Sequence, residues 1–151
     1  MCTSVLFSNR AYQQAGVRPS YGRLDPSHGA TFRRTLERAV ASGSPVVQVV
    51  TWNDFGEGTG VEPAREYGYR YLEAIQGAMR RFPGAAFPFR PEDLRLPLRI
   101  YHLRKRMAQS SSERKALDEV VDLLFAGEVA RASQGLDTLE GSARQPSSRA
   151  R

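Results

Sequence analysis

Residues 46–63 read VVQVVTWNDFGEGTGVEP, and this stretch decides the fold that the sequence predicts. Its first part, Val46–Trp52, is nearly continuous in β-branched residues and does not alternate with polar ones. That pattern is typical of a parallel strand that is buried on both faces. Asn53–Glu62 follows as a glycine-rich loop, and Pro63 stands at a favoured position for the first turn of a helix. The stretch therefore predicts a strand–loop–helix unit that ends near Phe82.

A second unit of the same kind precedes it in the chain. Thr3–Phe7 is short and apolar, which favours a strand, and Ser8–Gly29 has no period and is expected to be a long loop. Apolar residues four positions apart then predict a helix over Ala30–Ser42. Two consecutive strand–helix units imply a parallel crossover. Residues 1–83 are thus predicted to be α/β with the order βαβα, and their two strands need further neighbours in a sheet.

The rest of the chain is predicted to be helical. Apolar spacing and helix-stop residues predict three helices, over Pro97–Ala108, Glu113–Ala126 and Glu128–Leu139. The last two are expected to form an αα-hairpin around Gly127. Residues 84–140 are therefore predicted to be a helical extension, and residues 141–151, GSARQPSSRAR, a disordered tail.

Length and composition exclude several classes of protein. The chain has 151 residues, which is too short for a complete (β/α)₈ barrel of about 250 residues. It is 40% hydrophobic and 25% charged, as in ordinary globular domains, and it holds no apolar run long enough to span a membrane. The single cysteine, Cys2, excludes an internal disulfide, and His28 and His102 lack the spacing of metal ligands. We therefore expect no metal, no cofactor and no membrane partner, and the sequence leaves the localisation open.

The positive charge is concentrated in one segment. The net charge is +6, and Leu98–Lys115 carries six basic residues against the single acid Glu113. Such a segment can bind phosphates, which suggests a binding module that uses the basic helical extension. A solvated helix face explains the charge equally, and no nucleic-acid motif or interleaved aromatic residue accompanies it. We therefore do not expect nucleic acid as the partner.

Candidate chemistry gathers in the loop after Trp52. Asp54 and Glu57 lie three residues apart, and cleavage of a glycosidic bond usually needs two carboxyl groups with different protonation states. An aromatic ring such as that of Trp52 offers an apolar face on which a sugar can stack. Simpler interpretations stay open, because acidic pairs on glycine-rich turns are often only solvated. Glu62, directly before Pro63, can interact favourably with the positive N-terminal end of the following helix.

The sequence of residues 46–76, VVQVVTWNDFGEGTGVEPAREYGYRYLEAIQ, resembles the end of the catalytic barrel in the glycoside hydrolase family 71/99-like group. This group includes endo-α-mannosidase-like and α-1,3-glucanase-like enzymes and related polysaccharide-biosynthesis proteins. The resemblance rests on a pattern of the form W-N-[ED]-x-x-E-G-x-x-[IV]-E-P. Residues 21–37, YGRLDPSHGATFRRTLE, look like the penultimate loop and helix of such proteins, and Leu96–Leu136 is similar to their C-terminal extension.

The resemblance implies roles for five residues. Glu57 matches the carboxyl group taken as general acid/base, and Asp54 matches the second carboxyl group. The mannosidase-like branch has Glu at that second position, thought to assist the sugar 2-hydroxyl group as an intramolecular nucleophile, whereas the glucanase-like branch has Asp. Trp52, Asn53 and Glu62 match positions that bind or orient the substrate.

The resemblance also implies a fold and a function. We expect the C-terminal βαβα portion of a TIM (β/α)₈ barrel, followed by a small α-helical extension. The chain is then a C-terminal fragment of a glycoside hydrolase-like protein that acts on an α-linked mannoside or glucan. Its expected partners are a carbohydrate substrate and the missing N-terminal barrel strands, without which we expect no activity. A non-enzymatic module, or several copies that complete one barrel, are the alternatives.

Overall fold

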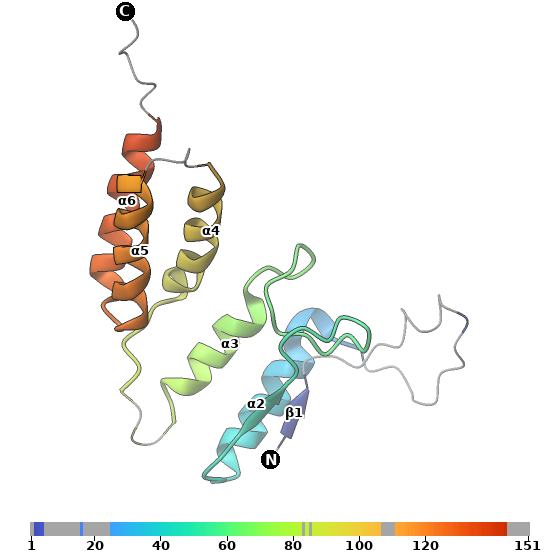
Figure 1. Ribbon diagram of the computed structural model, residues 1–151. Coiled ribbons are helices and arrows are strands. Elements are labelled where there is room, and N and C mark those ends of the chain that lie inside the picture. Colours follow the sequence, from blue (N-terminus) through green and yellow to red (C-terminus); the bar gives the residue numbers. More distant parts are fainter. Residues whose placement is uncertain are drawn as a thin grey trace, which may run out of the picture. The chain divides into compact units, whose positions relative to one another are not determined.

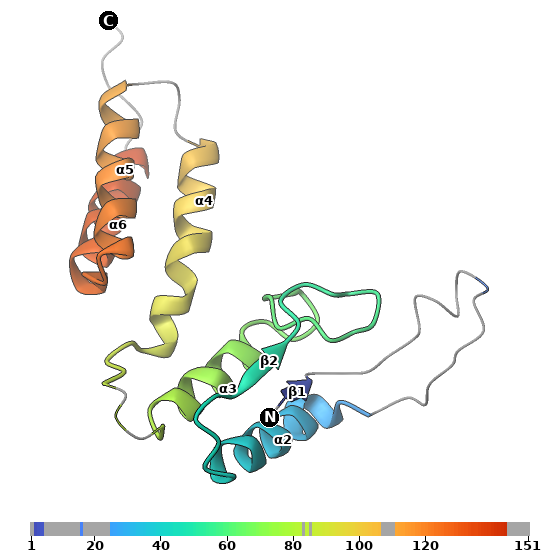
Figure 2. The ribbon, with the colours of Figure 1, turned by 60° about the horizontal axis from the view of Figure 1, so that its bottom comes forward.

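The computed structural model describes residues 2–4, 16, 25–82, 84, 86–106 and 111–144. The chain divides into two compact units, Met1–Pro88 and Phe89–Arg151. The boundary lies at Pro88, a few residues after the boundary at residue 83 that the sequence predicts. We describe each unit by itself (Figures 1 and 2).

The first unit contains a pair of strands and two helices. Its elements are β1 (Cys2–Ser4), the 3-10 turn η1 (Ser27–Gly29), α2 (Ala30–Ala41), β2 (Gln48–Val50) and α3 (Arg70–Met79). The strands pair in parallel, with Cys2 opposite Gln48 and Ser4 opposite Val50. Figure 2 shows both strands beside α2 and α3. The crossover between the strands therefore runs through α2.

Aromatic and aliphatic side chains of α2 and α3 form the core of the first unit. Its buried members are Phe32, Leu36, Val61, Tyr71 and Ala78. The rings of Phe32 and Tyr71 meet edge to face, with 5.3 Å between their centroids. Gly29, at the start of α2, has φ 87°, and a Cβ atom there would lie 2.6 Å from the Cδ atom of Arg70. A glycine is favoured here by the backbone conformation, and the Arg70 side chain packs closely against it.

The predicted βαβα portion of a (β/α)₈ barrel is wrong. The structure is mostly helical, and strand structure in the described residues is confined to β1 and β2. Of the predicted strand Val46–Trp52, only Gln48–Val50 adopts strand conformation, and Val46 is 67% exposed. A run of valines is stable as a buried parallel strand only inside a wider sheet. The local pattern does not report how many strands surround it, so the prediction of a long buried strand is wrong.

The segment after Pro63 also differs from the prediction. The helix begins at Arg70, not at Pro63, because a turn intervenes. A short antiparallel bridge joins Ala64 and Gly68, and the N–H of Gly68 donates to the carbonyl of Ala64 over 2.7 Å. Gly68 has φ 57°, which favours glycine and interrupts any helix that starts at Pro63. Of the other predicted elements, residues 5–7 of the first strand and most of the loop Ser8–Gly29 lie outside the described residues.

The second unit consists of three helices preceded by a 3-10 turn. Its elements are η2 (Pro91–Arg95), α4 (Leu96–Arg106), α5 (Ser111–Phe125) and α6 (Val129–Arg144). All three helices contribute to its core, whose buried members are Leu96, Ile100, Leu103, Leu117, Val120, Ala132 and Leu136. Figure 1 shows α5 and α6 side by side as an αα-hairpin. Gly127, with φ 78°, lies in the turn that joins them.

The end of α6 departs from the sequence prediction. The helix continues to Arg144, past Gly141, where the predicted disordered tail begins. Residues 145–151 of that predicted tail lie outside the described residues. Gly135 lies where α6 packs against Val120 of α5, since a Cβ atom there would be 2.6 Å from Cγ2 of Val120. A small residue at this position therefore lets the two helices pack closely.

Candidate functional site

The candidate residues lie on a compact loop between β2 and the turn that precedes α3, here called loop 51–62. Hydrogen bonds between backbone groups close its base. The N–H of Thr51 donates to the carbonyl of Thr59 over 3.1 Å, and the N–H of Val61 donates to the carbonyl of Thr51 over 3.0 Å. The hydroxyl groups of Thr51 and Thr59 are also hydrogen-bonded, with 2.8 Å between their oxygens. The peptide bond before Thr51 is cis.

Trp52 is held through its backbone while its side chain faces solvent. Its carbonyl accepts hydrogen bonds from the N–H groups of Val61, at 2.9 Å, and of Glu62, at 2.8 Å. The Trp52 side chain is 54% exposed, and Phe55 on the same loop is 56% exposed. Two aromatic residues thus offer apolar surface to water on a loop whose backbone is fixed, which is the arrangement a sugar-stacking surface requires.

The structure brings Asp54 and Glu57 together on one turn. The Oδ1 atom of Asp54 accepts a hydrogen bond from the backbone N–H of Glu57 over 2.9 Å. The Asp54 backbone is itself anchored at both groups, since its N–H donates to Oγ1 of Thr51 over 3.2 Å and its carbonyl accepts from the N–H of Thr59 over 3.0 Å. Both acidic side chains are half-buried. One carboxylate oxygen of Asp54, Oδ1, therefore maintains the turn.

Asn53 and Glu62 occupy different environments. Asn53 is exposed, and its carbonyl accepts from the N–H of Phe55 over 2.9 Å. Glu62 is half-buried at the base of the loop. Because α3 begins only at Arg70, Glu62 does not lie at a helix N-terminus, and that interpretation of its charge is wrong. The side chain of Asn53 is thus accessible from solvent. Glu62 is less accessible and is the last residue of the loop.

Sequence reasoning missed one residue of the site. Tyr67 falls within the helix that the sequence predicts after Pro63, but it precedes α3. Its hydroxyl group lies 3.1 Å from the carbonyl oxygen of Gly60 and 2.9 Å from that of Glu62. Burial raises the pKa of the Tyr67 phenol above its ordinary value of 10.0, and neighbouring Tyr71, Glu66 and Glu62 raise it further. A phenylalanine would satisfy the apolar pattern at this position. The extra hydroxyl group of a tyrosine is therefore the signal in the sequence that points to a hydrogen bond.

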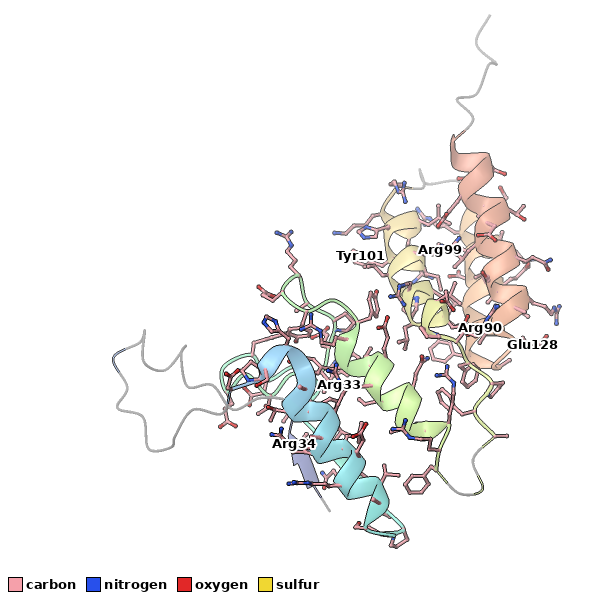
Figure 3. The ribbon with its side chains drawn as sticks, turned by 180° about the vertical axis from the view of Figure 1, so that it is seen from behind. Arg33, Arg34, Arg90, Arg99, Tyr101 and Glu128 are labelled. Carbon is pink, nitrogen blue, oxygen red and sulfur yellow. The ribbon has the colours of Figure 1, made fainter. Side chains whose placement is uncertain are left out.

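A hollow of about 200 Å³ lies elsewhere in the first unit, between α2 and the end of α3. Its lining residues are Arg33, Leu36, Glu37, Ala74, Gly77 and Arg81, none of which belongs to loop 51–62. Figure 3 shows Arg33 and Arg34 on α2. No cluster of three or more potential metal ligands occurs among the residues that the structure describes. Within the same residues, no helix has both the length and the apolar character needed to cross a bilayer.

The basic segment of the second unit is partly used for internal contacts. Arg99 of α4 forms ion pairs with Asp137, at 2.6 Å, and with Glu140, at 3.0 Å, both on α6. The hydrogen bond to Glu140 is the main reason that the pKa of Arg99 is raised, although burial opposes it. Arg104 pairs with Asp118 of α5 at 2.6 Å. Two of the six basic residues in this segment therefore hold α4 against its neighbours. Figure 3 shows Arg99 on α4.

The outer side of α4 keeps an aromatic residue beside a cation. Tyr101 is exposed, and Nζ of Lys105 lies 4.7 Å from the centroid of its ring. Leu98, one helical turn earlier, is exposed as well. These residues make α4 a surface of mixed character, not the continuous row of free cations that phosphate binding favours.

Comparisons with known proteins add no relative to this picture. We find no match to this chain among protein-family models, curated proteins or solved structures.

Proposed function

We propose that loop 51–62 is the carbohydrate-binding part of a glycoside hydrolase-like protein that acts on an α-linked polysaccharide or glycan. The observation that carries the proposal is one hydrogen-bonded loop that holds the exposed Trp52 together with two acidic residues, Asp54 and Glu57, the second of which donates its backbone N–H to the Asp54 carboxylate. An indole face suits the C–H groups of a sugar, and carboxylates suit its hydroxyl groups. The resemblance of residues 46–76 to the glycoside hydrolase family 71/99-like group supports the same substrate class.

The two carboxyl groups take different parts in the proposed chemistry. Glu57 serves as the general acid/base that donates a proton to the leaving oxygen. Asp54 offers Oδ2 to the sugar while Oδ1 holds the turn, so that this carboxylate is fixed in orientation. Asn53 and Glu62 assist in orienting the substrate.

We expect the chain by itself to bind and not to hydrolyse. Trp52, Asn53 and Phe55 are exposed to water, and an open site gives weaker electrostatic stabilisation of a transition state than a closed one. Hydrolysis then requires further protein groups that enclose the sugar. The alternative function, a module that binds through the basic helical extension, has less support because Arg99 and Arg104 are engaged in ion pairs within the unit.

Trp52 provides its own assay, because it is the only tryptophan in the chain. We would titrate the protein with soluble α-1,3-glucan and α-mannan oligosaccharides, and with a β-linked cello-oligosaccharide as comparison, by tryptophan fluorescence and calorimetry. The expected result is a change in Trp52 emission and a Kd of about 1 mM or tighter for one α-linked ligand. Trp52→Ala should abolish the heat of binding, whereas Phe125→Ala, at an 89% exposed aromatic residue of the second unit, should not. Absence of binding by the folded wild-type protein would overturn the proposal.

A further inference from the structure

The Tyr67 hydroxyl group joins loop 51–62 to the core of the first unit. On one side, its oxygen lies within hydrogen-bond distance of two loop carbonyl groups, those of Gly60 and Glu62. On the other side, the Tyr67 ring meets the Tyr71 ring with 4.7 Å between centroids, and Tyr71 in turn meets Phe32 of α2. A continuous series of aromatic contacts thus runs from the buried helix interface to the base of the loop.

The two carbonyl groups flank the residue that fixes Trp52. Val61 lies between Gly60 and Glu62, and its N–H is shared between the carbonyls of Thr51, at 3.0 Å, and Trp52, at 2.9 Å. Glu62 also donates its own N–H to the Trp52 carbonyl. A shift of residues 60–62 therefore disturbs the backbone of Trp52. The Tyr67 hydroxyl group has a single proton, which it donates to the carbonyl of Gly60 or of Glu62 or shares between them, so it restrains the segment that contains Val61.

We infer that Tyr67 is a positioning residue for the ligand, whose hydroxyl group holds residues 60–62 and thereby sets the pose of Trp52. This inference rests on the proposed carbohydrate site. It assigns the role to the hydroxyl group and not to the ring, because a phenylalanine retains the contact with Tyr71. Tyr67 touches no substrate in this scheme and acts only through the loop.

Ionisation of Tyr67 supplies a second way to remove the restraint. A phenolate cannot donate a hydrogen bond and would place negative charge against two carbonyl oxygens. The ionisable groups that act on it are Tyr71 of α3 and the carboxylates of Glu66 and Glu62, all of which oppose its ionisation. A phenol with the ordinary pKa of 10.0 is already neutral at physiological pH, and burial together with these groups raises the pKa of Tyr67 further, so that the restraint is lost only at alkaline pH.

The test compares Tyr67→Phe with Tyr101→Phe, which removes a hydroxyl group from an exposed tyrosine of the second unit. Amide hydrogen exchange by NMR at neutral pH should accelerate at Val61 and Glu62 in Tyr67→Phe, while core amides such as that of Ala78 keep their protection. Affinity for the α-linked oligosaccharide should fall about tenfold, which corresponds to one hydrogen bond of about 1.4 kcal/mol. Wild-type affinity should also decline as the pH rises above 10, and this decline should be smaller in Tyr67→Phe, which retains only the ionisation of Tyr71. Tyr101→Phe should match wild type in every measurement.

The outcomes separate this inference from the proposed function. Unchanged exchange at Val61 and Glu62 in Tyr67→Phe would overturn the positioning role, whatever the protein binds. Equal ligand affinity in wild type and Tyr67→Phe, or an alkaline decline of the same size in both proteins, would overturn it as well. Faster exchange at these two amides, in a protein that binds no oligosaccharide, would support the hydroxyl restraint and would refute only the carbohydrate proposal. If Tyr67→Phe fails to fold, the alkaline titration of the wild-type affinity decides, and a flat profile overturns the inference.

Discussion

The backbone N–H of Glu57 donates a hydrogen bond to Oδ1 of Asp54 over 2.9 Å, so the first candidate carboxylate shapes the turn that carries the second. This contact explains why a short acidic side chain stands at position 54. A glutamate at this position would extend past the N–H group by one methylene and lose the turn geometry. The difference between Asp and Glu therefore concerns loop structure as well as the reach of the carboxylate toward a sugar.

Asp54→Asn and Asp54→Ala should separate the structural role of Asp54, its hydrogen bond to the turn, from the role of its negative charge. Asn keeps an Oδ1 acceptor for the Glu57 N–H, so the free energy of unfolding should change little. Ala leaves that N–H without its acceptor, and stability should fall by about 1 kcal/mol. Urea unfolding monitored by Trp52 fluorescence measures both. Equal stability of the two variants would contradict the role of the Asp54–Glu57 hydrogen bond.

The chain should bind an α-linked oligosaccharide without cleaving it. The physical reason is the open, water-exposed position of Trp52 and Asn53. Release of reducing sugar over a long incubation measures this, with Glu57→Gln as the matched protein. Turnover in the wild type that disappears in Glu57→Gln would show that the expected inactivity is wrong and would assign catalysis to this chain.

Two glycines of α6 should respond in opposite directions to alanine. In Gly135→Ala the new methyl group would lie 2.6 Å from Cγ2 of Val120, and the required shift should cost about 1–3 kcal/mol. Gly141→Ala meets no heavy atom within 4 Å and replaces glycine in a helix, so it should stabilise the protein by up to about 1 kcal/mol. Thermal unfolding followed by circular dichroism measures the difference. If Gly135→Ala were as stable as wild type, α5 and α6 would have to lie farther apart than the contact between residue 135 and Val120 requires.

Arg99→Ala should destabilise the second unit more than Arg104→Ala. The Arg99 side chain is only 30% exposed and binds two acidic residues of α6, whereas both partners of the Arg104–Asp118 pair are exposed. We expect a loss of about 1 kcal/mol for Arg99→Ala and less than about 0.5 kcal/mol for Arg104→Ala, since exposed ion pairs contribute little. Urea unfolding in low and high salt checks this order, and the reverse order would contradict it.

Stability of the first unit should fall at alkaline pH. Burial is the main cause that raises the pKa values of both Tyr67 and Tyr71 above the ordinary value of 10.0. Folding thus favours the neutral phenols, and this contribution is complete below pH 10 and is lost as the pH rises through the raised pKa values. Unfolding free energies at pH 8 and pH 11 should differ less in Tyr67→Phe than in wild type. An identical pH dependence in the two proteins would contradict the assignment.

The sequence predicted the loop of the candidate site better than the elements around it. Glycines and short polar residues in Asn53–Glu62 encode a turn locally, which is why a turn that carries both Asp54 and Glu57 is predictable from the sequence. The prediction of a long buried strand over the preceding valines is wrong, because burial of a strand depends on its neighbours in a sheet and not on the strand itself. The start of α3 was misplaced because Pro63 suits a helix, whereas Gly68 signals a turn.

Pattern analysis reaches the role of Tyr67 only in part, because a hydroxyl group in an apolar pattern signals a hydrogen bond without identifying its acceptor. Its partners are the backbone carbonyls of Gly60 and Glu62, and every residue has a carbonyl group. No residue type marks such an acceptor in a sequence. Only the path of the folded chain places those two oxygens around one hydroxyl group.

The hydroxyl pair of Thr51 and Thr59 has a consequence for selectivity. Together with the backbone hydrogen bonds at the base of the loop, it fixes the loop conformation before any ligand arrives. Little conformational entropy then remains to be lost on association, so modest contacts suffice for measurable affinity. A preorganised surface of this kind discriminates by shape, and ligands that would need the loop to adapt should be rejected.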